Sequence, residues 1–235
     1  MSTLLLVLAG PMQSWGGPTS TGRRDTLPMP TKSAVVGLLG AAQGLARTDT
    51  EGLARLADLR FGVRTDQPGI LMRDFHTAPG RNRTRTVSDR YYLADAVFTA
   101  AVESDREHIS GIARALRNPV YAPCLGRRSC VPSRPVLLDV RHDLTLEEAL
   151  EAAPWQAAPW YQHRHGRPDT LPVHTDTRPG QHPTHHGDDH PVDFHHHRHR
   201  ARPVTATAVP LPREPDLPTH DPFAVFLDDL PGTTG

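Results

Sequence analysis

The stretch that decides the fold runs from residue 10 to residue 44 and reads GPMQSWGG at 10–17 and PTKSAVVGLLGAAQG at 30–44. The apolar run Thr3–Ala9 precedes it and is typical of a strand buried on both faces. Residues 32–46 predict a helix whose three glycines, three and seven residues apart, share one face. Each glycine weakens a helix by about 1 kcal/mol relative to alanine. We therefore expect this face to pack closely against another element.

The start of this helix is a candidate phosphate site. Thr31, Lys32 and Ser33 place hydroxyls, a cation and free backbone N–H groups at a helix N-terminus, where phosphate binds well. A Walker A loop is excluded, because Thr31 precedes the lysine and Thr26 stands where the first glycine is required. Nucleotide hydrolysis is therefore rejected.

The next segments predict a sheet with an insertion. Leu59–Arg64 alternates apolar residues with arginine, so we expect Arg60 and Arg64 on the open face of a half-exposed strand. Residues 66–90 predict a protruding hairpin with arms Ile70–His76 and Thr84–Arg90 and a polar tip. A polar segment of this length inside a compact domain is either disordered or functional.

The remaining elements complete an α+β pattern. Tyr91–Val102 predicts one long strand and Arg134–Val140 a further one. Without the insertion the order is β-α-β-β-α-β, the ferredoxin-like or RRM-like arrangement. The aromatic motifs of an RRM are missing, so its base-stacking mode is not assumed. Helix starts are predicted by three capping pairs: Thr48 with Glu51, Ser104 with Glu107, and Thr145 with Glu148.

Charge and composition narrow the function. The 235 residues carry no net charge, yet 25 of the 26 basic residues are arginine, a bias that a GC-rich genome would also produce. Residues 60–90 contain seven arginines and only three aspartates. Such a local excess of positive charge is typical of a surface that binds a phosphate backbone. No signal peptide or membrane-spanning segment is evident, so we expect a cytoplasmic protein without membrane contact. Cys124 and Cys130 then read as reduced, buried thiols.

The C-terminal part has a different composition. Residues 163–199 hold 11 of the 15 histidines, and 154–209 is rich in proline. We expect a small, partly irregular region there, with a last strand at Val204–Val209 and a mobile tail over 210–235. The run from His195 to His199 offers imidazoles for zinc or nickel. No spacing repeats, no thiol accompanies the imidazoles and nearby arginines repel cations, so a structural or accidental origin is favoured and no metal or cofactor is expected.

Several motifs together resemble the CRISPR-associated protein family five, in its type I-E Cascade branch. In the family's order they are Gly10–Gly16, Pro30–Ser33, Arg73–Thr77, Tyr92–Ala96 and Leu125–Cys130. The resemblance covers most of residues 1–140 and is thin beyond about residue 155.

The resemblance implies a non-catalytic, crRNA-binding subunit of a type I-E Cascade surveillance complex in antiviral defence. It implies that residues 1–153 form the RNA-binding domain, hold the 5′ handle of the crRNA, and press a thumb-like hairpin (about 66–90) on the backbone subunit. The implied partners are crRNA and the other Cascade subunits (the backbone and large subunits), with target DNA reached only through the assembled complex. The candidate RNA-binding residues are Gln13, Ser14, Trp15, Arg23, Arg24, Lys32, Ser33, Arg60, Arg64, Arg73, His76, Arg81, Arg83, Arg85, Arg90, Arg127 and Arg128.

Three alternatives stay open at this point. A metal-independent endoribonuclease needs a base, a proton donor and a cation, which His76, Tyr91 and Lys32 would supply. Trp15 is as well suited to anchoring a core as to contacting RNA. Arg127 and Arg128 would equally form structural ion pairs with Asp or Glu.

Overall fold

A computed structural model describes residues 1–17, 22–79 and 85–211. In this part of the chain the centre is a seven-stranded antiparallel sheet, with strands in the order β10-β11-β9-β4-β7-β1-β8. The strands are β1 (Ser2–Ala9), β4 (Arg60–Gln67), β7 (Val97–Ser104), β8 (Leu137–His142), β9 (Thr170–Asp176), β10 (His185–Asp193) and β11 (Arg198–Pro210). The expected α+β class is confirmed.

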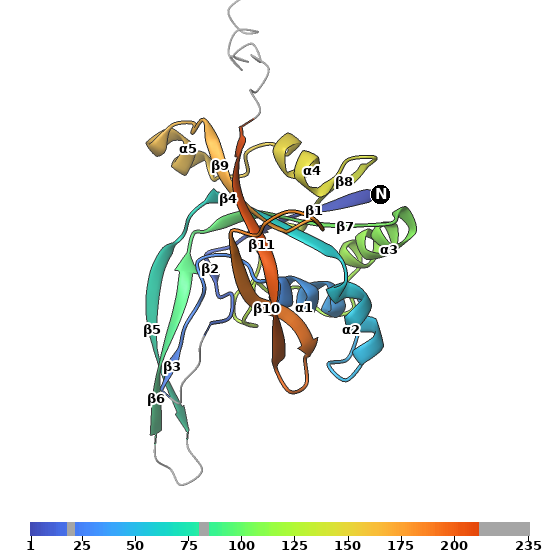
Figure 1. The fold of residues 1–235 in the computed structure, drawn as a ribbon. Coiled ribbons are helices and arrows are strands. Elements are labelled where there is room, and N and C mark those ends of the chain that lie inside the picture. Colours follow the sequence, from blue (N-terminus) through green and yellow to red (C-terminus); the bar gives the residue numbers. More distant parts are fainter. Residues whose placement is uncertain (18–21, 80–84, 212–235) are drawn as a thin grey trace, which may run out of the picture.

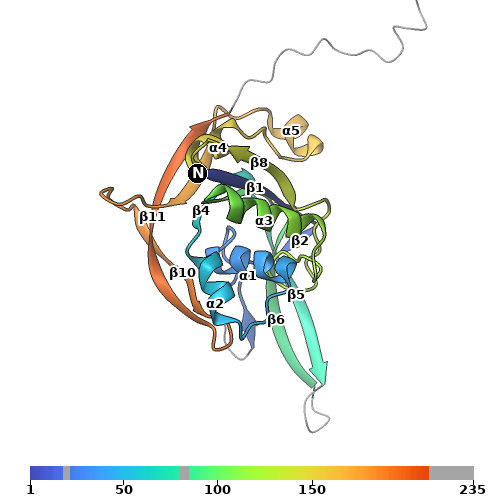
Figure 2. The same ribbon diagram turned by 90° about the vertical axis from the view of Figure 1, so that its right-hand side faces the viewer.

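Helices cover both faces of the sheet (Figures 1 and 2). On one face, Leu4, Leu6 and Leu8 of β1 pack in a core with α1 (Lys32–Gln43), α2 (Thr50–Ala57) and α3 (Arg106–Arg117). On the other, Leu5 packs with α4 (Leu146–Ala152). The short helix α5 (Pro159–His165) follows α4. Because alternate residues of a strand point to opposite faces, β1 is buried along its whole length, as its apolar run predicted.

A second, smaller sheet forms the thumb. The strands β5 (Ile70–Pro79) and β6 (Arg85–Ala94) pair in an antiparallel register from Ile70 opposite Ala94 to Pro79 opposite Arg85. The predicted hairpin is therefore confirmed. It projects from the body of the molecule (Figure 1). The short strands β2 (Met12–Gln13) and β3 (Arg23–Arg24) pair with the other edge of β6, so the N-terminal loop lies against the thumb.

The element boundaries differ from prediction where a local residue intervenes. Residues 91–102 are not one strand, because Asp95 takes a positive φ of 54° between β6 and β7. The helix α1 ends at Gln43, since Gly44 adopts a left-handed conformation with φ of 77°. Aspartates replace two expected caps: Asp49 begins α2 and Asp105 begins α3. The Thr145–Glu148 capping box at α4 is confirmed.

The C-terminal strands are longer than expected. β11 spans 13 residues rather than the six predicted, and β9 joins the sheet beside β4. Figure 2 shows β10 and β11 curving round the sheet toward α2, and β10 contacts both α1 and α2. Among the described residues, none of the helices has both the length and the apolar character to cross a membrane.

The glycine face of α1 provides a test of the packing. A Cβ at Gly40 would lie 2.9 Å from Leu53 Cδ2, in the contact between α1 and α2. Gly40→Leu should therefore lower the melting temperature, with an overpacking cost of about 1–3 kcal/mol. The control is Gly111→Leu on α3, where an added Cβ meets nothing within 4 Å. Equal melting temperatures for the two variants would contradict the predicted packing.

Candidate nucleic-acid interface

The base of the thumb is held together by Arg127. Its Nη1 donates to the carbonyl of Tyr91 (3.0 Å) and its Nη2 to the carbonyl of Arg24 (2.9 Å). The guanidinium also lies over the Tyr92 ring, 4.6 Å from the centroid. Arg127 thus links the loop after α3 to β3 and β6 through carbonyl groups. Among the described residues no Asp or Glu side chain pairs with Arg127, so the alternative of a structural ion pair is not borne out for this residue.

Gly126, next to Arg127, allows the loop after α3 to approach the backbone of Ser14 closely. At Gly126, φ is 89° and a Cβ would lie 1.6 Å from the carbonyl oxygen of Ser14. The amide of Ser14 donates to the carbonyl of Leu125 (3.1 Å). Only glycine combines this φ with such a close backbone approach. The contact between residues 14 and 126 therefore fixes the position of the loop that carries Arg127 and Arg128.

Two arginines at the thumb keep their side chains free. Arg24 and Arg90 are register partners in the parallel pairing of β3 with β6, so they lie side by side on one face. In residues 1–17, 22–79 and 85–211, neither guanidinium has an ion pair or hydrogen bond, and the buried Nε of Arg90 has no partner. The carboxylate of Asp74, directly across from Arg90, contacts His76 Nε2 instead. With Arg127 over Tyr92 on the same face, these residues form an arginine cluster (Arg24, Arg90 and Arg127).

The opposite face of the thumb has a different character. Arg73 donates two hydrogen bonds of 3.0 Å to Asp89, and Arg23 pairs with Asp25 (2.7 Å) beside the Tyr91 ring. The charges on this face are therefore largely compensated. Three apolar side chains are exposed there: Leu71, Phe75 and Val87.

The start of α1 is already occupied by the protein itself. The backbone amide of Lys32 donates to Asp189 Oδ2 (2.7 Å), which takes the place that a phosphate would fill. The ammonium of Lys32 is buried and pairs with Asp176 (2.9 Å). Arg202 bonds both carboxylates; burial lowers its pKa, but Asp189 and Asp176 outweigh burial and raise it. The predicted phosphate site is corrected to an internal ion network, in which Ser33 contacts His199.

Other predicted contacts are also structural. The Gln13 amide donates to the carbonyls of Leu8 (3.1 Å) and Ala96 (2.6 Å), and its oxygen accepts from Trp15 Nε1 (3.0 Å). Gln13, Ser14 and Trp15 are all buried, so the core-anchor alternative for Trp15 is confirmed. These three side chains offer no surface to RNA.

The expectation that Arg60 and Arg64 lie on an open face is wrong. Arg64 is fully buried, and it donates to the carbonyls of Ala153 (2.7 Å) and Pro154 (2.8 Å) while pairing with Asp66 (2.8 Å). Arg64 thus satisfies carbonyl groups at the C-terminal end of α4, which the local alternation could not reveal. Arg60 is half-buried and bonded to Glu147, so its charge is compensated.

The remaining predicted residues lie in the loop after α3 and at the tip of the thumb hairpin in the sequence. Arg128 is exposed in the loop beside Arg127. Arg81 and Arg83 lie outside the described residues, and Arg85 is the first residue of β6. Cys124 and Cys130 are free thiols whose pKa values are raised by burial.

The histidine-rich segment is built mainly into strands. In the part of the chain that the structure covers, no three His, Cys, Asp or Glu side chains gather to hold a metal ion. His174 lies 5.6 Å from His185 between ring centroids, and its pKa is lowered by burial and then by His185 and Arg202. The His174 imidazole is therefore a poor candidate for protonation at neutral pH.

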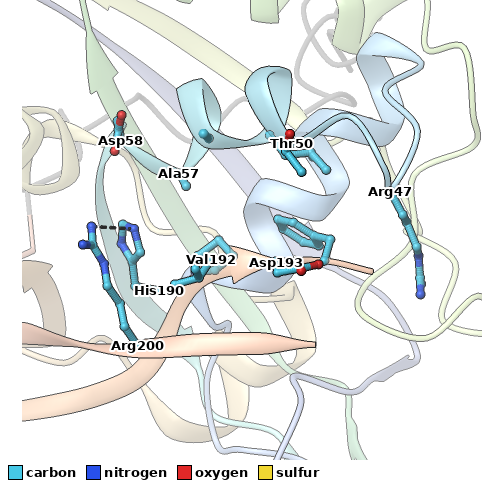
Figure 3. A pocket seen from close by; sticks show the side chains of 12 residues that line it. Arg47, Thr50, Ala57, Asp58, His190, Val192, Asp193 and Arg200 are labelled. Carbon is cyan, nitrogen blue, oxygen red and sulfur yellow. Dashed lines mark hydrogen bonds between the residues drawn. The ribbon is translucent and has the colours of Figure 1, made fainter. Parts of the chain in front are cut away.

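A pocket lies between α2 and the β10–β11 hairpin, shown in Figure 3. Arg200 Nη2 lies 2.9 Å from His190 Nε2, and the pKa of His190 is lowered by burial, then by Lys32 and Arg200. Asp58 and Asp193 line the same pocket. Because groups of both signs line it, the pocket favours no particular ligand charge.

Comparisons with known proteins identify what the chain is similar to. The family model described as CRISPR-associated protein (Cas5) matches residues 3–206. The CRISPR system Cascade subunit CasD of Escherichia coli (strain K12) is 40% identical over 158 residues, covering 58% of this chain and 70% of that protein. A solved structure described as a Cas protein has a TM-score of 0.72 at 37% identity, covering 91% of this chain and 99% of that one. A chain of a CRISPR RNA-guided surveillance complex has a TM-score of 0.71 at 34% identity, covering 89% and 91% respectively.

The internal network allows a test of the correction at Lys32. Lys32→Met should lower the free energy of unfolding, because Asp176 loses one buried partner. Breaking an isolated buried ion pair typically costs about 3–5 kcal/mol. The loss here should be smaller, because Arg202 still pairs with Asp176. The same variant should keep the salt dependence of RNA binding. A double-mutant cycle with Asp176→Asn measures the coupling. Unchanged stability together with a reduced salt slope would restore Lys32 as an RNA contact.

Proposed function

Because the chain belongs to the CRISPR-associated protein (Cas5) family, we propose that it is a non-catalytic, crRNA-binding subunit of a type I-E CRISPR Cascade surveillance complex. In this proposal it holds the 5′ handle of the crRNA in antiviral defence, working in the cytoplasm. Its partners are the crRNA and the backbone and large subunits, and it meets target DNA only through the assembled complex.

The arginine cluster is the observation that carries the proposal. Two adjacent guanidinium groups without a carboxylate partner repel each other, which is unfavourable unless an anion binds between them. Arginine holds phosphate bidentately, so the pair suits a nucleic-acid backbone. Arg128, exposed in the loop beside Arg127, adds a further positive charge next to the cluster.

The two thumb faces support two different partners. The face of Arg24 and Arg90 is cationic and fits RNA, whereas Leu71, Phe75 and Val87 expose apolar surface on the other face. An apolar patch of this kind is typical of a protein contact. We therefore assign the apolar face to the backbone subunit.

We further infer a ferredoxin-like core for residues 1–153. The strand order β4-β7-β1-β8, with α1 and α3 in the crossovers, supports it. That order is the one a β-α-β-β-α-β chain adopts when its two halves interleave in one antiparallel sheet.

The salt dependence of binding tests the RNA face. Arg24→Ala with Arg90→Ala should reduce the log–log salt slope of handle-RNA binding by about 1.4, at about 0.7 for each single-stranded phosphate contact. Folding stability should not fall, because neither guanidinium has an ion pair or hydrogen bond with a described residue to lose. The measurement is affinity for repeat-derived RNA over a salt series, made on the assembled complex.

Its control removes the same charge elsewhere. Arg114→Ala with Arg117→Ala takes two exposed arginines from α3, which lies away from the thumb (Figure 1). This variant should keep the slope. Equal slopes for both double variants would sink the assignment of Arg24 and Arg90 to phosphate.

A second candidate function is favoured by the contact between His76 and Asp74, which would orient an imidazole as a base. The other members of the expected trio are not brought to it. Tyr91 lies opposite Arg73 while His76 lies opposite Ser88, so the tyrosine and histidine point to different faces of the hairpin. Lys32 is buried in an ion pair. These positions support the non-catalytic assignment.

Incubation of the protein with repeat RNA in EDTA should therefore leave the RNA intact, as read on a denaturing gel. His76→Ala should give the same result and keep RNA affinity within a few fold. Metal-independent cleavage that disappears in His76→Ala would establish the endoribonuclease instead.

A further inference from the structure

Helix α5 presents an aromatic side chain that the proposed function does not use. Trp160 is 50% exposed, whereas Trp15 and Trp155 are 0% and 7% exposed. A half-exposed indole offers a flat apolar ring and an N–H donor to a ligand. Its surroundings therefore decide whether it has a ligand.

The indole stands on a rigid base. Tyr161 lies edge-on to Trp160 (5.7 Å between centroids) and to Trp155 (6.5 Å), and it stacks on His165 at 4.3 Å. Trp155 is fixed in turn, because its Nε1 donates to the carbonyl of Asp66 (2.8 Å). An exposed ring that is already ordered loses little conformational entropy on binding.

The charges of α5 favour a nucleic acid over a protein as the partner of Trp160. Three basic side chains, His163, Arg164 and His165, follow in the last turn of α5, and the sequence of the helix has no acidic residue. Arg164 is exposed and has no ion pair with any described residue. Aromatic rings interleaved with cations are the combination that binds single-stranded nucleic acid, by stacking on bases and pairing with phosphates.

The position of α5 joins it to the thumb. The Ala158 amide, just before α5, donates to Gln67 Oε1 (3.0 Å), and Gln67 Nε2 donates to the carbonyl of Asp95. Gln67 ends β4 three residues before β5, and Asp95 follows β6. In Figures 1 and 2, α5 and the thumb lie along the same lateral edge of the molecule, with α5 at the top and the thumb pointing to the bottom.

We propose that α5 is a second contact for single-stranded nucleic acid, in which Trp160 stacks on an unpaired base and Arg164 binds an adjacent phosphate. The inference rests on the proposed function only in taking nucleic acid to pass along the thumb. Guide RNA and a separated DNA strand share the chemistry that this site reads, since every base has a π-face.

Intrinsic fluorescence of the full chain isolates the site. Because Trp15 and Trp155 are buried, a strand that stacks on Trp160 should quench only part of the tryptophan emission. The probes are a mixed-sequence single-stranded RNA, the DNA strand of the same sequence, and the corresponding duplex. Quenching by single strands and not by duplex is expected, and Trp160→Leu should abolish it. The RNA and DNA arms distinguish the two sources of the strand.

Affinity measured by anisotropy of labelled strands gives the magnitude. Trp160→Leu should weaken single-strand binding by about 5- to 150-fold, the range for losing one stacked base, while Trp160→Phe keeps most of the affinity. Tyr121→Leu is the matched control, because it removes another exposed aromatic residue from the loop after α3. Wild-type affinity in Trp160→Leu, or no quenching in the wild type, overturns the proposal.

Two further readouts separate the alternatives. If Trp160→Leu binds both strands normally but fails to assemble with the other subunits, the patch is a protein interface and the proposal is wrong. Arg24→Ala with Arg90→Ala is measured in parallel on the handle RNA. If the Arg24→Ala with Arg90→Ala variant keeps the wild-type salt slope for handle RNA while Trp160→Leu still weakens single-strand binding, the handle assignment is refuted. The second contact at α5 is then unaffected.

Discussion

The partly buried carboxylate of Asp176 is the contact on which the arrangement of the molecule depends. It accepts from Lys32 Nζ (2.9 Å) in α1, from Arg202 Nη1 (2.7 Å) in β11 and from the amide of Phe61 (2.9 Å) in β4. One residue of β9 thereby joins the first helix, the central sheet and the last strand. Its negative charge is stable in the interior only because two cations and an amide compensate it. In the same network Asp189 accepts from the amide at the start of α1, so this helix end is not open to an external anion.

The distribution of arginine partners then separates scaffold from surface. Arg64 is buried among a carboxylate and carbonyl groups, Arg202 is partly buried between two carboxylates, and Arg127 bonds the carbonyls of β3 and β6. Arg24 and Arg90 have no such partners among the described residues. Two adjacent like charges without a partner repel each other and lower stability. Arg24 and Arg90 are therefore better explained by anion binding than by a contribution to folding.

Local patterns predicted local structure well. The apolar run of β1 and the two arms of the thumb could be read from the sequence, because each depends on alternation within a few residues. The burial of Arg64 could not, since its partners lie in the segment around Pro154, some 90 positions later. Lys32 and Asp176 are 144 positions apart, so the phosphate site looked open from the local sequence. The strands β9 to β11 were hidden by a composition of histidine, proline and arginine that has no clean period of two.

The predominance of arginine over lysine also has a structural explanation, besides the base composition of the genome. The only lysine is buried, where a compact ammonium fits beside Asp176. Each exposed cation is therefore an arginine, which both stacks and forms several hydrogen bonds at once. Arg23 over Tyr91 and Arg127 over Tyr92 already use the stacking mode within the thumb. A surface that combines planar cations with ordered aromatic rings can bind bases and phosphates together, and this combination recurs at α5. The hydrogen bonds of Gln67 join the segment before α5 to the residue that follows β6 of the thumb.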